Sequence, residues 1–122
     1  MENDTRLYHN PRCSKSRAAL ELLRERGIEP RIVPYLDEPP TATELRQLVS
    51  MTGQRARALV REGDVEPALG LSPTSSEDEL IAAMARHPRL IERPIFVHGG
   101  RAVIGRPPER VLDLLDGAAP SP

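Results

Sequence analysis

Cysteine and aromatic residues are scarce in this sequence. The chain of 122 residues has a single cysteine, Cys13, with two tyrosines, one phenylalanine and no tryptophan. One cysteine excludes an internal disulfide and any zinc or iron–sulfur site built from several cysteines, so we expect no bound metal. With so few rings, base stacking and an aromatic ligand cage are not expected either. The core must therefore be built from Leu, Val, Ile and Ala.

An excess of positive charge and long apolar runs are also missing. Lysine and arginine together number 17 against 18 acidic residues, which gives a net charge of −1. This balance argues against a nucleic-acid partner, which would require a basic surface. No apolar run approaches the ~20 residues that cross a membrane. The N-terminal MENDTR has neither the basic nor the apolar region of a signal peptide, so we expect a cytoplasmic protein.

The first third of the chain has the pattern of a strand, a helix and a second strand. Thr5–Tyr8 predicts a strand that ends at a turn, and Ser14–Arg26 has leucines at helical spacing before Gly27. A second strand is predicted over Arg31–Leu36, although Pro34 within it indicates an edge strand or a bulge. Two strands joined through a helix are expected to be parallel neighbours.

A helical segment follows. Thr41–Glu44 and Ser76–Glu79 both have the spacing of a capping box and predict the starts of two helices. The second of these helices is expected to end at His87, which precedes a proline. Between them, residues Arg55–Glu62 predict one more short helix.

The last third changes to a hairpin and a closing helix. Ile95–Val97 and Ala102–Ile104 flank Gly99-Gly100, which predicts two antiparallel strands joined by a two-residue turn. A helix is predicted over Glu109–Asp116, and residues 117–122 are expected to form a disordered tail. The order β-α-β, helical insertion, β-β-α predicts an α/β fold with a four-stranded mixed sheet, in one domain over residues 1–116.

Cys13 lies in the loop between the first predicted strand and the first predicted helix. Backbone N–H groups at a helix N-terminus stabilise an anion, and a thiol placed there can have its pKa lowered from ~8.5 into a range of roughly 3.5–7.5. Arg12, Lys15 and Arg17 add positive charge that favours both a thiolate and an oxyanion substrate. A cysteine used only as a small buried residue is the alternative, but these polar neighbours disfavour its burial.

The spacing around Cys13 limits the thiol chemistry. A cysteine phosphatase loop needs an arginine six positions after the cysteine, where this chain has Ala19. A dithiol redox motif needs a second cysteine at the position of Ser16. A reductase with this single thiol would need an external thiol to complete the reaction, and glutathione is the expected donor.

The segment YHNPRCSKSR, residues 8–17, resembles the active-site segment of the glutaredoxin-dependent arsenate reductases, the ArsC type within the thioredoxin-like superfamily. Four further segments resemble that family in the same order, and together the resemblance covers about residues 5 to 115: VPYLDEPPT, ALVR, HPRLIERPIFV and IGRPPERVLDLL. The resemblance implies a thioredoxin-like fold with a helical insertion between the two halves of the sheet. It also implies a role in arsenic detoxification.

The resemblance assigns roles to particular residues. Cys13 corresponds to the nucleophile that attacks arsenate, and the family's three oxyanion-binding arginines correspond to Arg61, Arg93 and Arg106. Guanidinium groups suit a tetrahedral oxyanion because their donors form a planar fork. The resemblance also implies supporting roles. His9 corresponds to a histidine that helps to keep the thiol ionised, and Asn10 and Ser16 correspond to residues that shape the loop by hydrogen bonds. Pro94 corresponds to a proline whose preceding peptide bond is expected to be cis.

The implied reaction converts arsenate to arsenite. Cys13 attacks the arsenic, glutathione joins as co-substrate and glutaredoxin reduces the adduct, with no bound cofactor. A monothiol glutathione-dependent oxidoreductase or deglutathionylase using Cys13 and Ser16 is one alternative. A second is an RNA-polymerase-binding regulator like the Spx proteins, although Ser16 interrupts the Cys-x-x-Cys switch of those regulators that have it.

Overall fold

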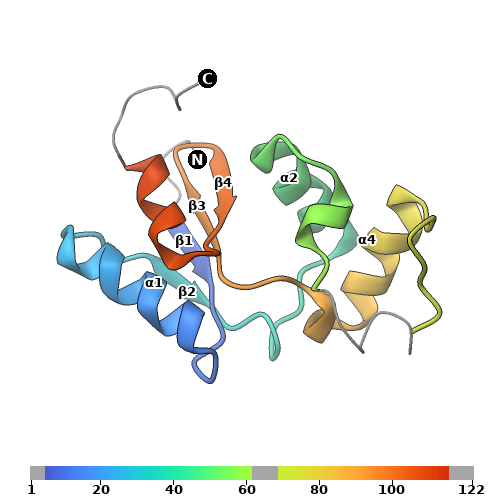
Figure 1. Cartoon of the computed structure of the whole chain (residues 1–122), viewed down its shortest axis with the longest axis horizontal. Coiled ribbons are helices and arrows are strands. Elements are labelled where there is room, and N and C mark those ends of the chain that lie inside the picture. Colours follow the sequence, from blue (N-terminus) through green and yellow to red (C-terminus); the bar gives the residue numbers. More distant parts are fainter. Residues whose placement is uncertain (1–4, 62–68, 116–122) are drawn as a thin grey trace. The chain divides into compact units, whose positions relative to one another are not determined.

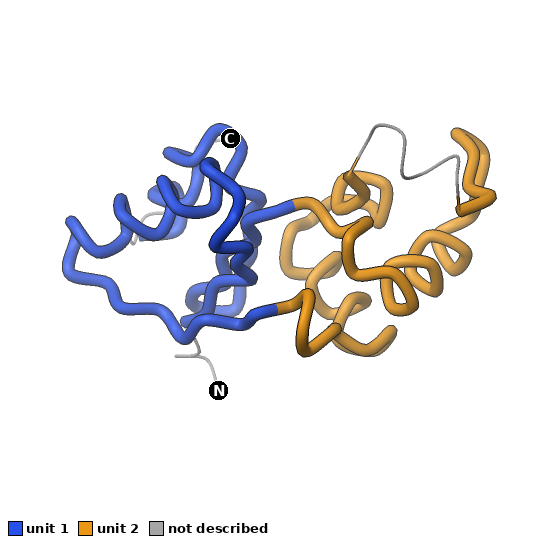
Figure 2. The backbone as a smooth tube through the Cα atoms, turned by 90° about the horizontal axis from the view of Figure 1, so that it is seen from below, with its two compact units in different colours: residues 1–34, 93–122 blue, residues 35–92 orange. Residues whose placement is uncertain are grey.

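The computed structural model describes residues 5–61 and 69–115, and the chain divides into two compact units (Figures 1 and 2). The first unit combines residues 1–34 with 93–122, and the second comprises residues 35–92. The proposed tail at 117–122 lies outside the described residues, and one domain over 1–116 stays a prediction. Within the described ranges, no helix is both long and apolar enough to span a bilayer.

The first unit contains a four-stranded mixed sheet, which confirms the predicted topology. Its strands are β1 (Thr5–Tyr8), β2 (Arg31–Val33), β3 (Ile95–His98) and β4 (Arg101–Ile104), in the order β2-β1-β3-β4. β1 runs parallel to β2 and antiparallel to β3, and β3 is antiparallel to β4. β2 is shorter than predicted because the chain leaves the strand at Pro34, which has no N–H to donate to a ladder.

The hairpin between β3 and β4 has the predicted two-residue turn. Gly99 and Gly100 both adopt positive φ, at 61° and 79°. Type I′ turns require positive φ at both central positions, and glycine adopts it without steric cost. The turn thereby fixes the register that pairs Ile95 with Ile104.

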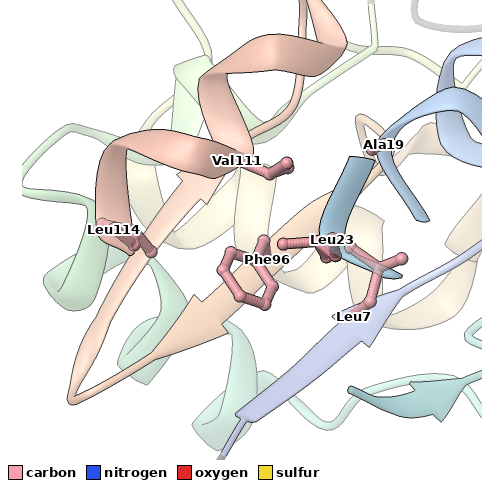
Figure 3. Close-up of a cluster of buried hydrophobic side chains, with 6 residues drawn as sticks. All are labelled: Leu7, Ala19, Leu23, Phe96, Val111 and Leu114. Carbon is pink, nitrogen blue, oxygen red and sulfur yellow. The ribbon is translucent and has the colours of Figure 1, made fainter. Parts of the chain in front are cut away.

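Helix α1 (Ser14–Glu25) and the 3-10 helix η3 (Pro108–Leu114) pack on the same face of this sheet. The core there is an aliphatic cluster around the single phenylalanine (Figure 3): Leu7, Ala19, Leu23, Phe96, Val111 and Leu114. Leu7 and Phe96 are cross-strand partners, so their side chains share a face. The closing helix begins one residue earlier than predicted, and the last residue of that prediction lies outside the described ranges.

The second unit is helical. It contains α2 (Ala42–Thr52), α4 (Glu77–Arg86) and the 3-10 helices η1 (Ala56–Leu59) and η2 (Pro88–Leu90). Thr41 caps α2 by accepting from the Glu44 N–H, and Ser76 and Glu79 form a complete capping box on α4. Of the helix predicted over 55–62, the described residues 55–61 form only the 3-10 turn Ala56–Leu59, because the next residue, Val60, forms a β-bridge with Ile91, and residue 62 lies outside the described residues.

Candidate active site

Cys13 is the N-cap residue of α1, at the end of the loop that follows β1. Its backbone is extended, with φ −97° and ψ 123°, and its carbonyl accepts the first helical bond from the Arg17 N–H at 3.0 Å. The Cys13 N–H donates to the Asn10 carbonyl at 3.0 Å, which closes the loop. The Cys13 sulfur thus lies at the positive end of the helix dipole.

The thiol of Cys13 is half-buried and its pKa is lowered. Burial is the largest single influence and raises the pKa, because it disfavours the charged thiolate. The backbone N–H groups of Ser16 and Lys15, together with a hydrogen bond and the charge of Arg93, lower the pKa by more. The lowered pKa favours the thiolate, which is the reactive form of cysteine.

Ser16 organises the loop from inside the protein. Its side chain is fully buried, and its hydroxyl accepts from the Asn10 N–H at 3.0 Å. The same hydroxyl forms a hydrogen bond of 2.6 Å with Nδ1 of His9. The Asn10 side-chain oxygen in turn accepts from the Arg12 N–H at 3.0 Å. The structure thus brings the predicted loop-shaping residues into one hydrogen-bonded group beside Cys13.

His9 is buried, with 8% of its surface exposed, and its pKa is lowered. Burial is the main cause, and the charges of Arg24 and Arg17 add to it. His9 is therefore a neutral imidazole at pH 7, not a cation that attracts a thiolate. Its hydrogen bond with Ser16 connects it to the loop that carries Cys13.

Arg93 and Arg106 belong to the first unit, which also contains Cys13. The Arg106 guanidinium donates from Nη1 to the Arg93 carbonyl at 3.0 Å, and the side chain of Arg93 hydrogen-bonds Cys13. The Arg93–Pro94 peptide bond is cis, as the sequence resemblance implied, and the Arg106–Pro107 bond is cis as well. Two of the three predicted oxyanion arginines are thus in the same unit as the cysteine.

Comparison with known proteins shows the family to which the chain belongs. The ArsC family model matches residues 8–114. An arsenate reductase of Neisseria meningitidis serogroup A is 47% identical over 115 residues, covering 92% of this chain and 98% of that protein. The uncharacterised protein YfgD of Escherichia coli K12 is 49% identical, covering 94% of this chain and 99% of that one. The chain belongs to the ArsC family.

A solved structure confirms the thioredoxin-like α/β fold of this ArsC protein. The arsenate reductase from Vibrio cholerae superimposes with a TM-score of 0.86 at 45% identity, and the match covers 92% of this chain and 98% of that one. The family membership and the fold expected from the sequence are both confirmed.

Arg61, the third predicted arginine, belongs to the second unit. It is half-buried, and its N–H donates to the Leu90 carbonyl at 2.6 Å, next to the bridge between Val60 and Ile91. This pairing fixes the backbone of Arg61 within its own unit. Its assignment to the oxyanion remains a prediction from the motif.

Sequence reasoning missed Gly105, which precedes Arg106 at the end of β4. Its N–H donates to the Pro94 carbonyl at 2.8 Å, and it is buried. The signal that could have identified it is a glycine at the end of a predicted strand, a pattern typical of close backbone approach.

Among residues 5–61 and 69–115, no three His, Cys, Asp or Glu side chains form a group that could hold a metal ion.

Proposed function

We propose that this ArsC-family protein is an arsenate reductase in which Cys13 is the nucleophile. The observation that carries the proposal is the stabilised Cys13 thiol, with its lowered pKa, hydrogen-bonded by the side chain of Arg93 at the N-terminus of α1. The same donors suit a tetrahedral dianion, because guanidinium forks and helix N-termini both bind oxyanions. The relatives named arsenate reductase support arsenate as that oxyanion.

The first step is a displacement at arsenic. The Cys13 thiolate attacks As(V), a sulfur–arsenic bond forms, and one arsenate oxygen leaves as water after taking up a proton. Arg93 and Arg106 neutralise the charge of the remaining oxygens, a role that the sequence motif also assigns to Arg61. His9, Asn10 and Ser16 hold the loop so that the sulfur points at the bound anion, and Pro94 holds the segment that carries Arg93.

The second and third steps need external thiols, because the chain has only one cysteine. Glutathione displaces a second oxygen as water and forms a Cys13–As–glutathione adduct. A glutaredoxin thiol then attacks the glutathione sulfur, forming a mixed disulfide, and the electron pair of the broken sulfur–arsenic bond reduces As(V) to As(III). Hydrolysis of the remaining Cys13–As bond releases arsenite. The thiol must stay reduced between turnovers, which fits a reducing compartment such as the cytoplasm.

The test is NADPH oxidation coupled through glutathione reductase, with glutathione and glutaredoxin present and arsenate added or withheld. We expect arsenate-dependent oxidation by the wild type, and none above background from Cys13→Ser. Ser14→Ala, which changes an exposed neighbour of Cys13, is the matched control and should retain activity.

Two results would contradict the proposal. Activity retained in Cys13→Ser would remove the nucleophile assignment. NADPH oxidation that requires a glutathione mixed disulfide as substrate, and does not respond to arsenate, would favour the monothiol oxidoreductase instead. Omitting glutathione or glutaredoxin one at a time tests the electron donors separately from the substrate.

A further inference from the structure

We propose that Gly105 is a positioning residue for Cys13, because its lack of a side chain lets the end of β4 lie against Pro94 and so holds Arg93 at the thiol. The inference rests on Cys13 as the reacting group of the proposed function. Its principal measurement uses the thiol alone, so it can fail or succeed independently of arsenate reduction.

There is no room for a side chain at position 105. A Cβ placed there would lie 2.9 Å from Cγ of Pro94 and 3.0 Å from Cγ1 of Val111. Carbon atoms in contact normally stay about 3.5–4.0 Å apart, so at least one neighbour would have to move. Gly105 is not among the glycines with positive φ, so the requirement for glycine here is one of space and not of backbone conformation.

The two neighbours differ in how they can move. Val111 belongs to the buried cluster of the first unit, where it contacts the core from η3 (Figure 3). Close packing there resists its displacement. Pro94 carries its Cγ in a ring closed onto its own backbone nitrogen, so pushing that atom also pushes the peptide that joins Pro94 to Arg93. We therefore expect a methyl group at position 105 to displace the 93–94 segment.

Hydrogen bonds make the contact between the two segments specific. The Gly105 N–H donates to the Pro94 carbonyl at 2.8 Å, and the next residue, Arg106, donates from its side chain to the Arg93 carbonyl at 3.0 Å. Consecutive residues of one segment thus hold consecutive carbonyls of the other. The side chain of Arg93 then reaches Cys13, which completes the connection from Gly105 to the thiol.

The test is the pH dependence of Cys13 alkylation by iodoacetamide, which reports on one thiol because the chain has one cysteine. In Gly105→Ala we expect the pKa of Cys13 to rise and alkylation at neutral pH to be severalfold slower. The double variant Gly105→Ala/Arg93→Ala should match Arg93→Ala alone, because Gly105 acts through Arg93. In the coupled assay, KM for arsenate should rise in Gly105→Ala.

Val111→Ala supplies both a control and a partial rescue. Alone it should lower the melting temperature and leave the pKa of Cys13 unchanged, since it weakens the core without pressing on Pro94. Combined with Gly105→Ala it removes one of the two close contacts, so the pKa should lie between those of Gly105→Ala and the wild type. If Gly105→Ala alone does not fold, the pKa of Cys13 is measured in this double variant instead and compared with that of Val111→Ala.

Three outcomes would overturn the inference. An unchanged pKa of Cys13 in a folded Gly105→Ala variant would leave Gly105 with a merely structural role. Additive shifts in Gly105→Ala/Arg93→Ala would show that Gly105 does not act through Arg93. If Gly105→Ala alone does not fold, the comparison is between Gly105→Ala/Val111→Ala and Val111→Ala. An equal pKa of Cys13 in these two variants would again leave Gly105 with a merely structural role.

Discussion

At the scale of single residues, the proposed function gives Arg93 a part in both the ionisation of the thiol and the binding of the substrate. Its hydrogen bond and charge lower the pKa of Cys13, and a guanidinium at that place also faces any anion that the sulfur attacks. Under the proposed function, Arg93 would therefore have two separable effects, one on the thiol before arsenate binds and one on the oxyanion afterwards.

Arg93→Ala should impair both effects. We expect slower alkylation of Cys13 at neutral pH, because the pKa of the thiol rises, and a loss of about 10²-fold in kcat/KM for arsenate, as for the removal of an oxyanion donor elsewhere. At a pH where the thiol is fully ionised, the alkylation rates of variant and wild type should converge while the arsenate defect persists. Arg26→Ala, which removes an exposed arginine beyond the far end of α1, should change neither rate. Unaltered arsenate kinetics in Arg93→Ala would remove its assignment.

The burial of His9 should make stability depend on pH. Its pKa is lowered from the usual 6.5, so below that pH the unfolded chain binds a proton that the folded chain does not. Stability is then fully present above about pH 6.5 and decreases as the pH falls toward the pKa of the folded state. Urea unfolding of the wild type, measured from about pH 7.5 down to about pH 5, should show this loss of unfolding free energy. The loss should be smaller in His9→Gln. An identical pH dependence in the two proteins would assign the loss to other groups.

At the scale of elements, the start of α4 is specified by a complete capping box. The Ser76 hydroxyl accepts from the Glu79 N–H at 3.1 Å, and the Glu79 carboxylate accepts from the Ser76 N–H at 2.6 Å. Ser76→Ala should lower the free energy of unfolding by about 1 kcal/mol, measured by urea denaturation. Ser50→Ala, at an exposed helical position of α2, should cost nothing, because alanine is the better helix former. Equal stabilities of the two variants would show that the box contributes little.

Local signals explain why most elements were predictable. Capping residues, Gly99-Gly100 and the alternation of apolar residues act over a few positions, and the elements that they specify are present. The predictions differ from the structure where the end of an element depends on a residue far along the chain. The short helix ends before Val60, which pairs with Ile91 some 30 positions later. A window of local sequence does not contain that partner, so the predicted helix over 55–62 was too long.

The site was predictable to a similar extent. The sequence placed Cys13 before a helix, where the structure has it, and the motif selected Arg61, Arg93 and Arg106 among sixteen arginines, whose roles stay predictions. Neither observation indicated that His9 is neutral or that Gly105 contacts Pro94. Both facts depend on burial and on atoms brought together from distant segments: Gly105 and Pro94 are eleven positions apart, in a contact that the hairpin register creates.

At the scale of the whole molecule, charge is divided unevenly along a nearly neutral chain. Residues 5–34 and 93–115, which belong to the unit that contains Cys13, include eleven basic and five acidic residues, although the full chain has a net charge of −1. Arg12, Lys15 and Arg17 are exposed around the thiol, and residues 5–20 include no acidic residue at all. Such a field raises the local concentration of a dianion and is screened by salt.

We therefore expect kcat/KM for arsenate to fall as salt rises from about 0.01 M to about 0.1 M, over which the Debye length shortens from about 30 Å to about 10 Å. Arg12→Gln/Lys15→Gln should lower kcat/KM at low salt and flatten its salt dependence, because both charges lie beside Cys13. The matched control, Arg26→Gln/Arg31→Gln, removes the same net charge beyond the far end of α1, roughly 18 Å along the helix, and should keep most of the dependence. The assay uses limiting arsenate with saturating glutathione and glutaredoxin, and repeats at saturating arsenate correct for salt effects on the donors. Equal flattening of the salt dependence in both double variants would mean that net charge alone, and not the cations around the thiol, attracts the substrate. A salt dependence that is the same in all three proteins would mean that neither contributes.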